Sequence, residues 1–206
     1  NNSIWLGSVP SSTDEAYYNN AFGEGALDAI TTGDYNEAFG YNALGATTGG
    51  NRNVAMGYGA MSSNTDGTHN VALGMETLRD STGHTYNTAV GYNAMLSMGG
   101  NVVGNVAVGG FALYYPSGNY NTALGYKAIY GAAAGTVTAW GNVGIGKEAL
   151  MNITSANRNV AIGEGAGKAI TTGLYNVLIG SHAGNALTTD SNNVVIGTFA
   201  GQNTTS

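Results

Sequence analysis

The chain has 206 residues, a formal charge of −6 and no cysteine; only 9% of its residues are charged, although 43% are hydrophobic. This balance favours a packed structure over disorder, and the acidic charge argues against nucleic acid as a partner. No apolar run approaches the ~20 residues of a membrane helix, so we expect no membrane insertion by this segment.

Residues 1–18 are predicted to form a degenerate first coil and a wide turn. The phrase Ser3-Ile4-Trp5-Leu6-Gly7 is a weak copy of a unit that fills the rest of the chain. Residues 8–18 contain one of the two prolines and the acidic pair Asp14-Glu15, which is typical of a solvated turn. A linker between two domains is the alternative. No signal peptide is visible, and we interpret the chain as a segment of a longer protein or as a trimmed mature product.

Residues 19–206 repeat one short unit and are predicted to form one continuous domain. Each unit begins with asparagine, and most units are 17 residues long. Such a period indicates a repeat protein, in which each unit contacts only its neighbours and the units stack into an elongated body. The lead asparagines are Asn19, Asn36, Asn53, Asn70, Asn87, Asn105, Asn121, Asn142, Asn159, Asn176 and Asn193.

Numbering the unit from its asparagine gives a predicted structure for each position. Positions 1 to 5 are short, β-branched and bounded by glycine, which indicates a strand, and positions 8 to 12 are predicted to form a second short strand. Positions 13 to 17 are turn-like. The predicted fold is all-β: a parallel β-solenoid, or β-roll, of about twelve 17-residue coils with two short strands per coil. At ~4.8 Å per coil the rod would be roughly 55 Å long.

Stacking explains the two most constant positions. Asparagines at one angular position can form a hydrogen-bonded ladder along the rod, which would satisfy each buried amide. Glycine at position 5 is expected to need a positive φ or a very close neighbour. These turn glycines are Gly23, Gly40, Gly57, Gly74, Gly91, Gly109, Gly125, Gly146, Gly163, Gly180 and Gly197.

The first strand is apolar on both of its faces. Positions 2 and 4 point one way and position 3 points the other, so a thin coil can bury only one set. We therefore predict that a second copy of the chain covers the other face; a coil wide enough to bury both faces is the alternative. Position 9 is glycine in the last coils, where position 3 grows to Leu178 and Val195. This exchange indicates that positions 3 and 9 fill the same space.

Aromatic residues are the candidate binding residues. An insertion at 130–140 ends in Trp140, and insertions in solenoids often map to the binding face. Trp140 beside Tyr114 and Tyr115 would form a patch suited to sugars or protein; a loop that packs its own aromatics is the alternative. Tyrosines before the lead asparagine are interpreted as structural. Those after the position-5 glycine are candidate surface-binding residues: Tyr41, Tyr58, Tyr92 and Tyr126.

Motifs for catalysis and metal binding are absent from the sequence. The three histidines and twelve carboxylates show no zinc, calcium-loop or nucleophile-elbow spacing. Glycine pairs such as Gly23-Glu24-Gly25 lack the βαβ context of a nucleotide site. We expect no cofactor and no enzymatic activity.

The phrase N-x-A-[hydrophobic]-G-x-x-A, as in residues 159–166, resembles the head repeat of YadA-like trimeric autotransporter adhesins. Phrases with T-T-G and Y-N between units also resemble repeats of bacteriophage tail fibres. The resemblance covers residues 19–206, although the 17-residue period is longer than the usual head repeat. It implies a homotrimer of left-handed β-rolls, packed through apolar strand faces, intertwined or side by side.

The function expected from these features is a structural and adhesive segment of an extracellular fibre, on a bacterial surface or a virion. Such a rod would bind a host-surface glycan or protein through many weak contacts that add by avidity. A self-assembling architectural filament subunit is the alternative. An ice-binding solenoid is less favoured because only one threonine position persists and it lies in the turns. An enzyme on a β-helix is less favoured because the carboxylates show no catalytic pairing.

Overall fold

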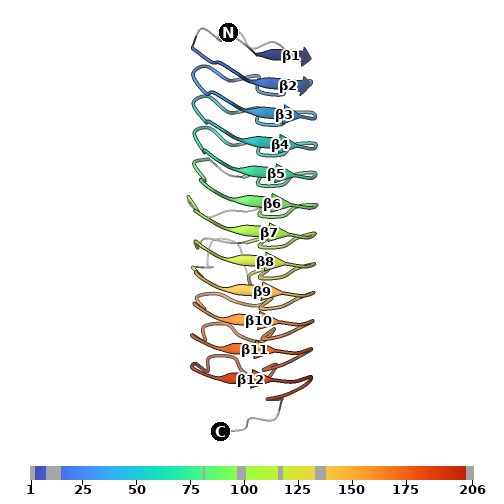
Figure 1. The fold of residues 1–206 in the computed structure, drawn as a ribbon, viewed down its shortest axis with the longest axis vertical. Coiled ribbons are helices and arrows are strands. Elements are labelled where there is room, and N and C mark those ends of the chain that lie inside the picture. The colour runs from blue at the N-terminus through green and yellow to red at the C-terminus, as the bar shows by residue number, and fades with distance from the viewer. Residues whose placement is uncertain are drawn as a thin grey trace.

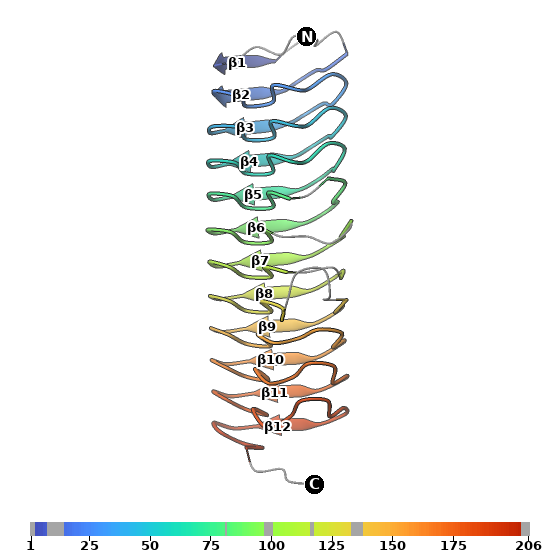
Figure 2. The same ribbon diagram turned by 180° about the vertical axis from the view of Figure 1, so that it is seen from behind.

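The computed structural model describes residues 3–7, 15–80, 82–96, 101–115, 118–132 and 138–202. All regular structure in these residues is β-strand, and the strands form one twelve-stranded sheet in chain order. Figures 1 and 2 show the coils stacked as a straight rod with β1 at one end and β12 at the other. The strands are β1 (Ile4–Gly7), β2 (Asn20–Gly23), β3 (Glu37–Phe39), β4 (Val54–Met56), β5 (Val71–Leu73), β6 (Thr88–Val90), β7 (Val106–Val108), β8 (Thr122–Leu124), β9 (Val143–Ile145), β10 (Val160–Ile162), β11 (Val177–Ile179) and β12 (Val194–Ile196).

Every strand pairs in parallel with the next, and equal repeat positions lie side by side. Val160 pairs with Val177, and Ile162 pairs with Ile179. Residues 3–7 belong to the same sheet, because Ile4 pairs with Asn20 and Gly7 with Gly23. The predicted parallel β-solenoid of coils spaced by about 17 residues is therefore confirmed. Most of the wide turn predicted after the first coil, residues 8–14, lies outside the described residues, as do 133–137 of the insertion.

The prediction of two strands per coil is wrong, because the described part of each coil contains one. Positions 7 and 9 take left-handed backbone conformations that end any strand there, as at Asn42 (φ 53°) and Leu44 (φ 52°). The segment still bonds to the next coil, since Leu44 N donates to Ala60 O at 3.0 Å. It also bonds within its own coil, where Ala43 N donates to Gly40 O at 3.3 Å. Positions 6 to 11 are thus a run of tight turns facing the sheet.

The interior lies between position 3 of the strand and the turn segment. Side chains at position 3 are fully buried in most coils, as are the alanines at position 8 and the leucines, methionines or isoleucine at position 9. Buried side chains at position 9 have φ between 47° and 52°. Their burial, worth roughly 1.5–3 kcal/mol per large apolar side chain, offsets the cost of a left-handed conformation of about 1–2 kcal/mol.

Positions 3 and 9 share one space, as the glycine–leucine exchange predicted. A Cβ on Gly184 would lie 2.7 Å from a methyl group of Leu178, and a Cβ on Gly167 would also lie 2.7 Å from that side chain. Leu178 therefore fills the space left by glycine in its own coil and in the preceding one. The reverse exchange occurs at Gly144, whose Cβ would lie 2.7 Å from Ile129.

The lead asparagines form the predicted ladder inside the rod. Asn19 through Asn176 are at most 1% exposed. Each Oδ1 accepts from the backbone N of the next asparagine at 2.8–3.1 Å. It also accepts from that residue's Nδ2 at 2.9–3.3 Å. The second Nδ2 hydrogen reaches a carbonyl at the far turn of the coil, such as Gly50 O at 2.8 Å from Asn36. Between Asn36 and Asn176, each ladder amide thus uses its oxygen and both of its Nδ2 hydrogens.

The position-5 glycines from Gly23 to Gly180 meet both conditions proposed for them, and Gly197 meets the first. Their φ values lie between 124° and 138°. From Gly23 to Gly180, an added Cβ would lie 2.4–2.8 Å from a backbone atom of the next glycine in the column. No side chain fits at this distance, so glycine is required both for conformation and for space.

Candidate functional site

The outer face of the sheet is a continuous apolar surface. It is formed by positions 2 and 4, which are partly or largely exposed in a single chain. Met56, Val108, Ile162 and Ile179 are each 37–44% exposed. In β2 and β3, position 2 is polar: it is Asn20 and Glu37, and Asn20 Nδ2 donates to both carboxylate oxygens of Glu37. The apolar surface therefore extends over the coils from β4 to β12.

A second surface runs along the edge where the chain enters each strand. It is formed by the residue directly before each lead asparagine, which we call position 17 whatever the length of the coil, and we call this surface the position-17 stripe. Its residues share a φ between 56° and 60°. Neighbouring side chains stack along the rod: the Tyr18 and Tyr35 rings are 4.9 Å apart and 7° from parallel, and those of His69 and Tyr86 are 4.7 Å apart. The stripe consists of Tyr18, Tyr35, Arg52, His69, Tyr86, Tyr120, Arg158 and Tyr175.

The candidate tyrosines at position 6 lie on the opposite edge of the coil. Tyr41, Tyr58, Tyr92 and Tyr126 are 45–54% exposed. The Tyr41 and Tyr58 rings stack, with their centres 5.2 Å apart and their planes 12° from parallel. The structure thus places these four tyrosines on an exposed edge of the rod.

Trp140 does not lie with Tyr114 and Tyr115 as the sequence analysis proposed. Tyr114 stacks on Tyr130 at 5.1 Å, and Tyr115 meets both of these rings edge-on. Trp140 instead contacts Arg158, whose guanidinium carbon is 4.1 Å from the centre of its ring. The predicted patch of Trp140 with Tyr114 and Tyr115 is wrong because the two tyrosines follow the core-lining position 9. Trp140 lies elsewhere on the coil, directly before position 17.

Tyr114, Tyr115 and Tyr130 form an aromatic cluster with their neighbours Phe111 and Tyr126. The Lys127 ammonium lies 5.4 Å from the ring centres of both Tyr126 and Tyr130. Burial raises the pKa of the Tyr114 and Tyr130 hydroxyls above the ordinary value. These tyrosines therefore remain neutral at physiological pH and present an uncharged surface.

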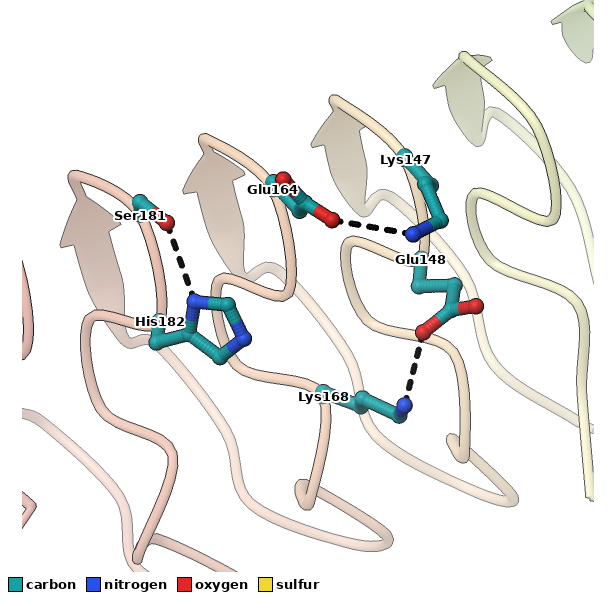
Figure 3. Close-up of polar contacts among 6 residues, drawn as sticks. All are labelled: Lys147, Glu148, Glu164, Lys168, Ser181 and His182. Carbon is teal, nitrogen blue, oxygen red and sulfur yellow. Dashed lines mark hydrogen bonds and ion pairs between the residues drawn. The ribbon is translucent and has the colours of Figure 1, made fainter.

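Ion pairs connect the coils near β9, β10 and β11. Figure 3 shows Lys147 reaching Glu164 at 3.0 Å and Lys168 reaching Glu148 at 2.6 Å, while Ser181 Oγ bonds the His182 ring. The hydrogen bond from each lysine lowers the pKa of its carboxyl group. Exposed pairs of this kind contribute little stability, and they leave both charges neutralised.

The described residues offer neither a metal cluster nor a membrane-spanning helix. Within the ranges given above, no group of three or more His, Asp or Glu side chains is placed to hold a metal ion. None of the residues that the structure describes belongs to a helix capable of crossing a bilayer.

His84 is a buried histidine whose ionisation is strongly perturbed. Its side chain is buried at the turn before position 17, where its Nδ1 accepts from Val102 N at 2.9 Å. Among the described residues its Nε2 has no hydrogen-bond partner. Burial lowers the pKa of His84 to about 4. The neutral imidazole is thus the form that the folded chain accepts.

Acidification is therefore expected to destabilise the rod around His84. Between pH 6.5 and 4 the unfolded chain binds a proton at this residue and the folded chain does not, so stability falls as pH falls, by about 3 kcal/mol in total. Urea unfolding at pH 8, 6, 5 and 4 measures this, with His84→Gln, which has no titratable side chain, as the comparison. A slope shared equally by both chains would assign the pH dependence to other groups.

No protein-family model matches the chain, and neither curated proteins nor solved structures contain a significant match. The fold defines its class: a β-solenoid with one strand per coil.

Sequence reasoning missed the left-handed positions 7, 9 and 17. A signal was present, since glycine occurs at each of them: Gly25, Gly59 and Gly165 at position 7, Gly167, Gly184 and Gly201 at position 9, and Gly104 and Gly141 at position 17. A position that alternates between glycine and bulky residues indicates a positive φ that stacking imposes on every coil.

Proposed function

We propose that this chain is a structural and adhesive segment of an extracellular fibre, either a bacterial surface adhesin or a virion tail fibre. It would act through multivalent contacts from a stiff rod that associates with other copies of itself. The single observation that supports this most strongly is the apolar outer face of the sheet. Large exposed apolar surfaces on soluble proteins commonly mark interaction sites.

The apolar face fits a second copy of the chain better than a compact partner. It follows the rod from β4 to β12, where position 4 is apolar in every coil and position 2 is valine or threonine. A parallel copy would meet it in register, coil against coil, as a rotation axis along the rod requires. The homotrimer implied by the resemblance to YadA-like heads is the assembly that we propose.

The rod is also suited to display weak sites many times. The ladder bonds and parallel pairing hold each coil in the same orientation, so exposed tyrosines at position 6 recur along one edge. Rigid tyrosines lose little conformational entropy on binding. Several weak contacts in a row would then add through avidity to a host-surface glycan or protein.

Light scattering after size exclusion, at several protein concentrations, tests the assembly. The proposal expects a fixed mass near three chains of 20.8 kDa. The double variant Val108→Glu and Ile162→Glu should yield monomers without unfolding, because both side chains are more than a third exposed in the single chain. Thr172→Glu, exposed at the turn edge, is the matched control and should leave the mass unchanged.

Two results would contradict this assembly. A wild-type monomer at all concentrations would remove self-association. A mass that climbs steadily with concentration would favour the architectural filament subunit in place of a closed trimer.

A further inference from the structure

The insertion in the coil that begins at Asn121 ends in Trp140, whose ring lies within the position-17 stripe, against Arg158. Position 17 of this coil is Gly141, which has no side chain. Trp140 takes its place and lies under Arg158, whose guanidinium carbon is 4.1 Å from its ring centre and 5.3 Å from that of Tyr175. We call these three side chains, Trp140, Arg158 and Tyr175, the Arg158 stack.

Backbone hydrogen bonds hold the Arg158 stack in place before any ligand arrives. Asn157 Oδ1 accepts from Trp140 N at 2.8 Å, and Asn157 O accepts from Tyr175 N at 3.1 Å. Trp140 O accepts from Arg158 N at 3.1 Å. A site fixed in this way loses little freedom on binding.

The stack is strained and exposed together. Arg158 and Tyr175 have φ of 56° and 58°, while Trp140 and Tyr175 are 39% and 47% exposed. At position 9, burial of the side chain offsets the cost of the left-handed conformation. The side chains of the Arg158 stack are partly exposed, so ring stacking takes the place of burial. Strained conformations that carry exposed side chains are a reason to look for a binding role.

The Arg158 guanidinium has donors to spare. It carries five N–H groups, and one bonds the Tyr175 hydroxyl. Within the part of the chain that the structure describes, it contacts no carboxylate. By contrast Arg79, Lys147 and Lys168 each pair with an acidic side chain.

The charge distribution favours an anion at this end of the rod. Residues 118–202 contain four Lys or Arg and three Asp or Glu, a local charge of +1. Residues 1–66 contain seven acidic residues and only Arg52 as a base, a local charge of −6. The whole net charge of the protein is therefore carried by the opposite end.

We propose that the Arg158 stack binds an acidic sugar, a pyranose that bears a carboxylate. The carboxylate would accept two N–H bonds from the outer edge of the guanidinium, the arrangement that arginine favours. The apolar face of the sugar ring would lie against Trp140 and Tyr175, whose rings combine an apolar body with a polar atom. This assignment rests on the proposed adhesive function and names the ligand class for it.

Arg52 provides an internal control. It occupies position 17 and lies 5.4 Å over the Tyr35 ring, as Arg158 lies over Tyr175. It has no tryptophan beneath it, and it lies in the acidic part of the chain. An arginine over a single tyrosine ring should therefore fail to bind the sugar there.

The test is a titration of the full chain with a galacturonic acid oligosaccharide, followed by the indole N–H signals in ¹⁵N–¹H spectra. The sequence has two tryptophans, so Trp5 on β1 serves as the unperturbed signal, and Trp140→Phe assigns the other. We expect the Trp140 signal to shift saturably. Arg158→Gln should weaken binding at least tenfold and Arg52→Gln less than twofold. The uncharged galactose oligosaccharide should bind at least tenfold more weakly.

Three results would overturn the proposal: no shift of Trp140, equal binding by Arg158→Gln, or an equal shift with sodium acetate at the same carboxylate concentration. The last would reduce the site to a simple anion site. Sugar binding by a chain that is monomeric in light scattering would contradict the proposed fibre assembly and support the sugar site. A trimer that binds no sugar would remove the site and keep the assembly.

Discussion

Replacing Gly163 with alanine is expected to lower the free energy of unfolding by about 4 kcal/mol, through backbone strain and steric overlap together. Part of the loss is conformational, because Gly163 has a φ of 132°, a region that costs alanine about 1–3 kcal/mol. The remainder is steric, since the new Cβ would lie 2.5 Å from Gly180 O and 2.9 Å from Ser181 N. The coils that contain β10 and β11 would have to move apart to admit it, which weakens the parallel pairing between these two strands.

Gly197→Ala separates these two causes. Gly197 has nearly the same φ, 125°, but an added Cβ would meet only Ala200 Cβ at 3.6 Å. We expect a loss of about 1–2 kcal/mol there, from conformation alone. Urea unfolding gives the global loss, and hydrogen exchange of the β11 and β12 amides gives the local loss at each site. Equal losses in the two variants would show that close approach of the coils does not select glycine.

Replacing Asn70 with aspartate is expected to cost about 3 kcal/mol at pH 7, although the two side chains have the same shape. Asn70 Nδ2 donates to Asn53 Oδ1 at 3.1 Å and to His84 O at 2.7 Å. A carboxylate has no hydrogen to donate, so three acceptors would face one another in the interior. The buried charge adds to the loss of both hydrogen bonds.

The pH dependence of this variant gives a second readout. Burial disfavours the charged form and raises the pKa of the new carboxyl above its unfolded value, so the folded state takes up a proton as pH falls. The penalty relative to wild type should therefore shrink at lower pH. Asn192→Asp, at an exposed side chain beside the ladder, should change stability by less than about 0.5 kcal/mol. A comparable loss in both variants would exclude the ladder as the cause.

The internal order of the rod could be predicted from the sequence because stacking turns sequence position into spatial position. Each residue at position 1 of one coil must meet position 1 of the next, as the pairing of Val160 with Val177 shows. Hydrogen bonding between Asn53 and Asn70 and close contact between Gly163 and Gly180 follow from the period alone. The contact between positions 3 and 9 was readable for a different reason, since a larger residue such as Leu178 accompanies glycine at Gly184.

The cross-section of a coil could not be predicted in the same way. The period does not state which positions face each other across one coil, so positions 8 to 12 were assigned to a second strand. In the structure Leu27 and Ile129 have φ of 51° and 47°, conformations that local preference disfavours and that packing against neighbouring coils maintains. Tertiary structure overrides local preference there.

The sequence by itself determined the solenoid, its register, the asparagine ladder and the need for glycine at position 5, because these contacts join equal positions one period apart. Only the tertiary structure decided the single strand per coil, the partly exposed apolar face of the sheet, and the meeting of Trp140 with Arg158 in place of Tyr114. These features depend on how one coil closes around its interior. That closure is set by packing between different positions, for which a repeat carries no spacing rule.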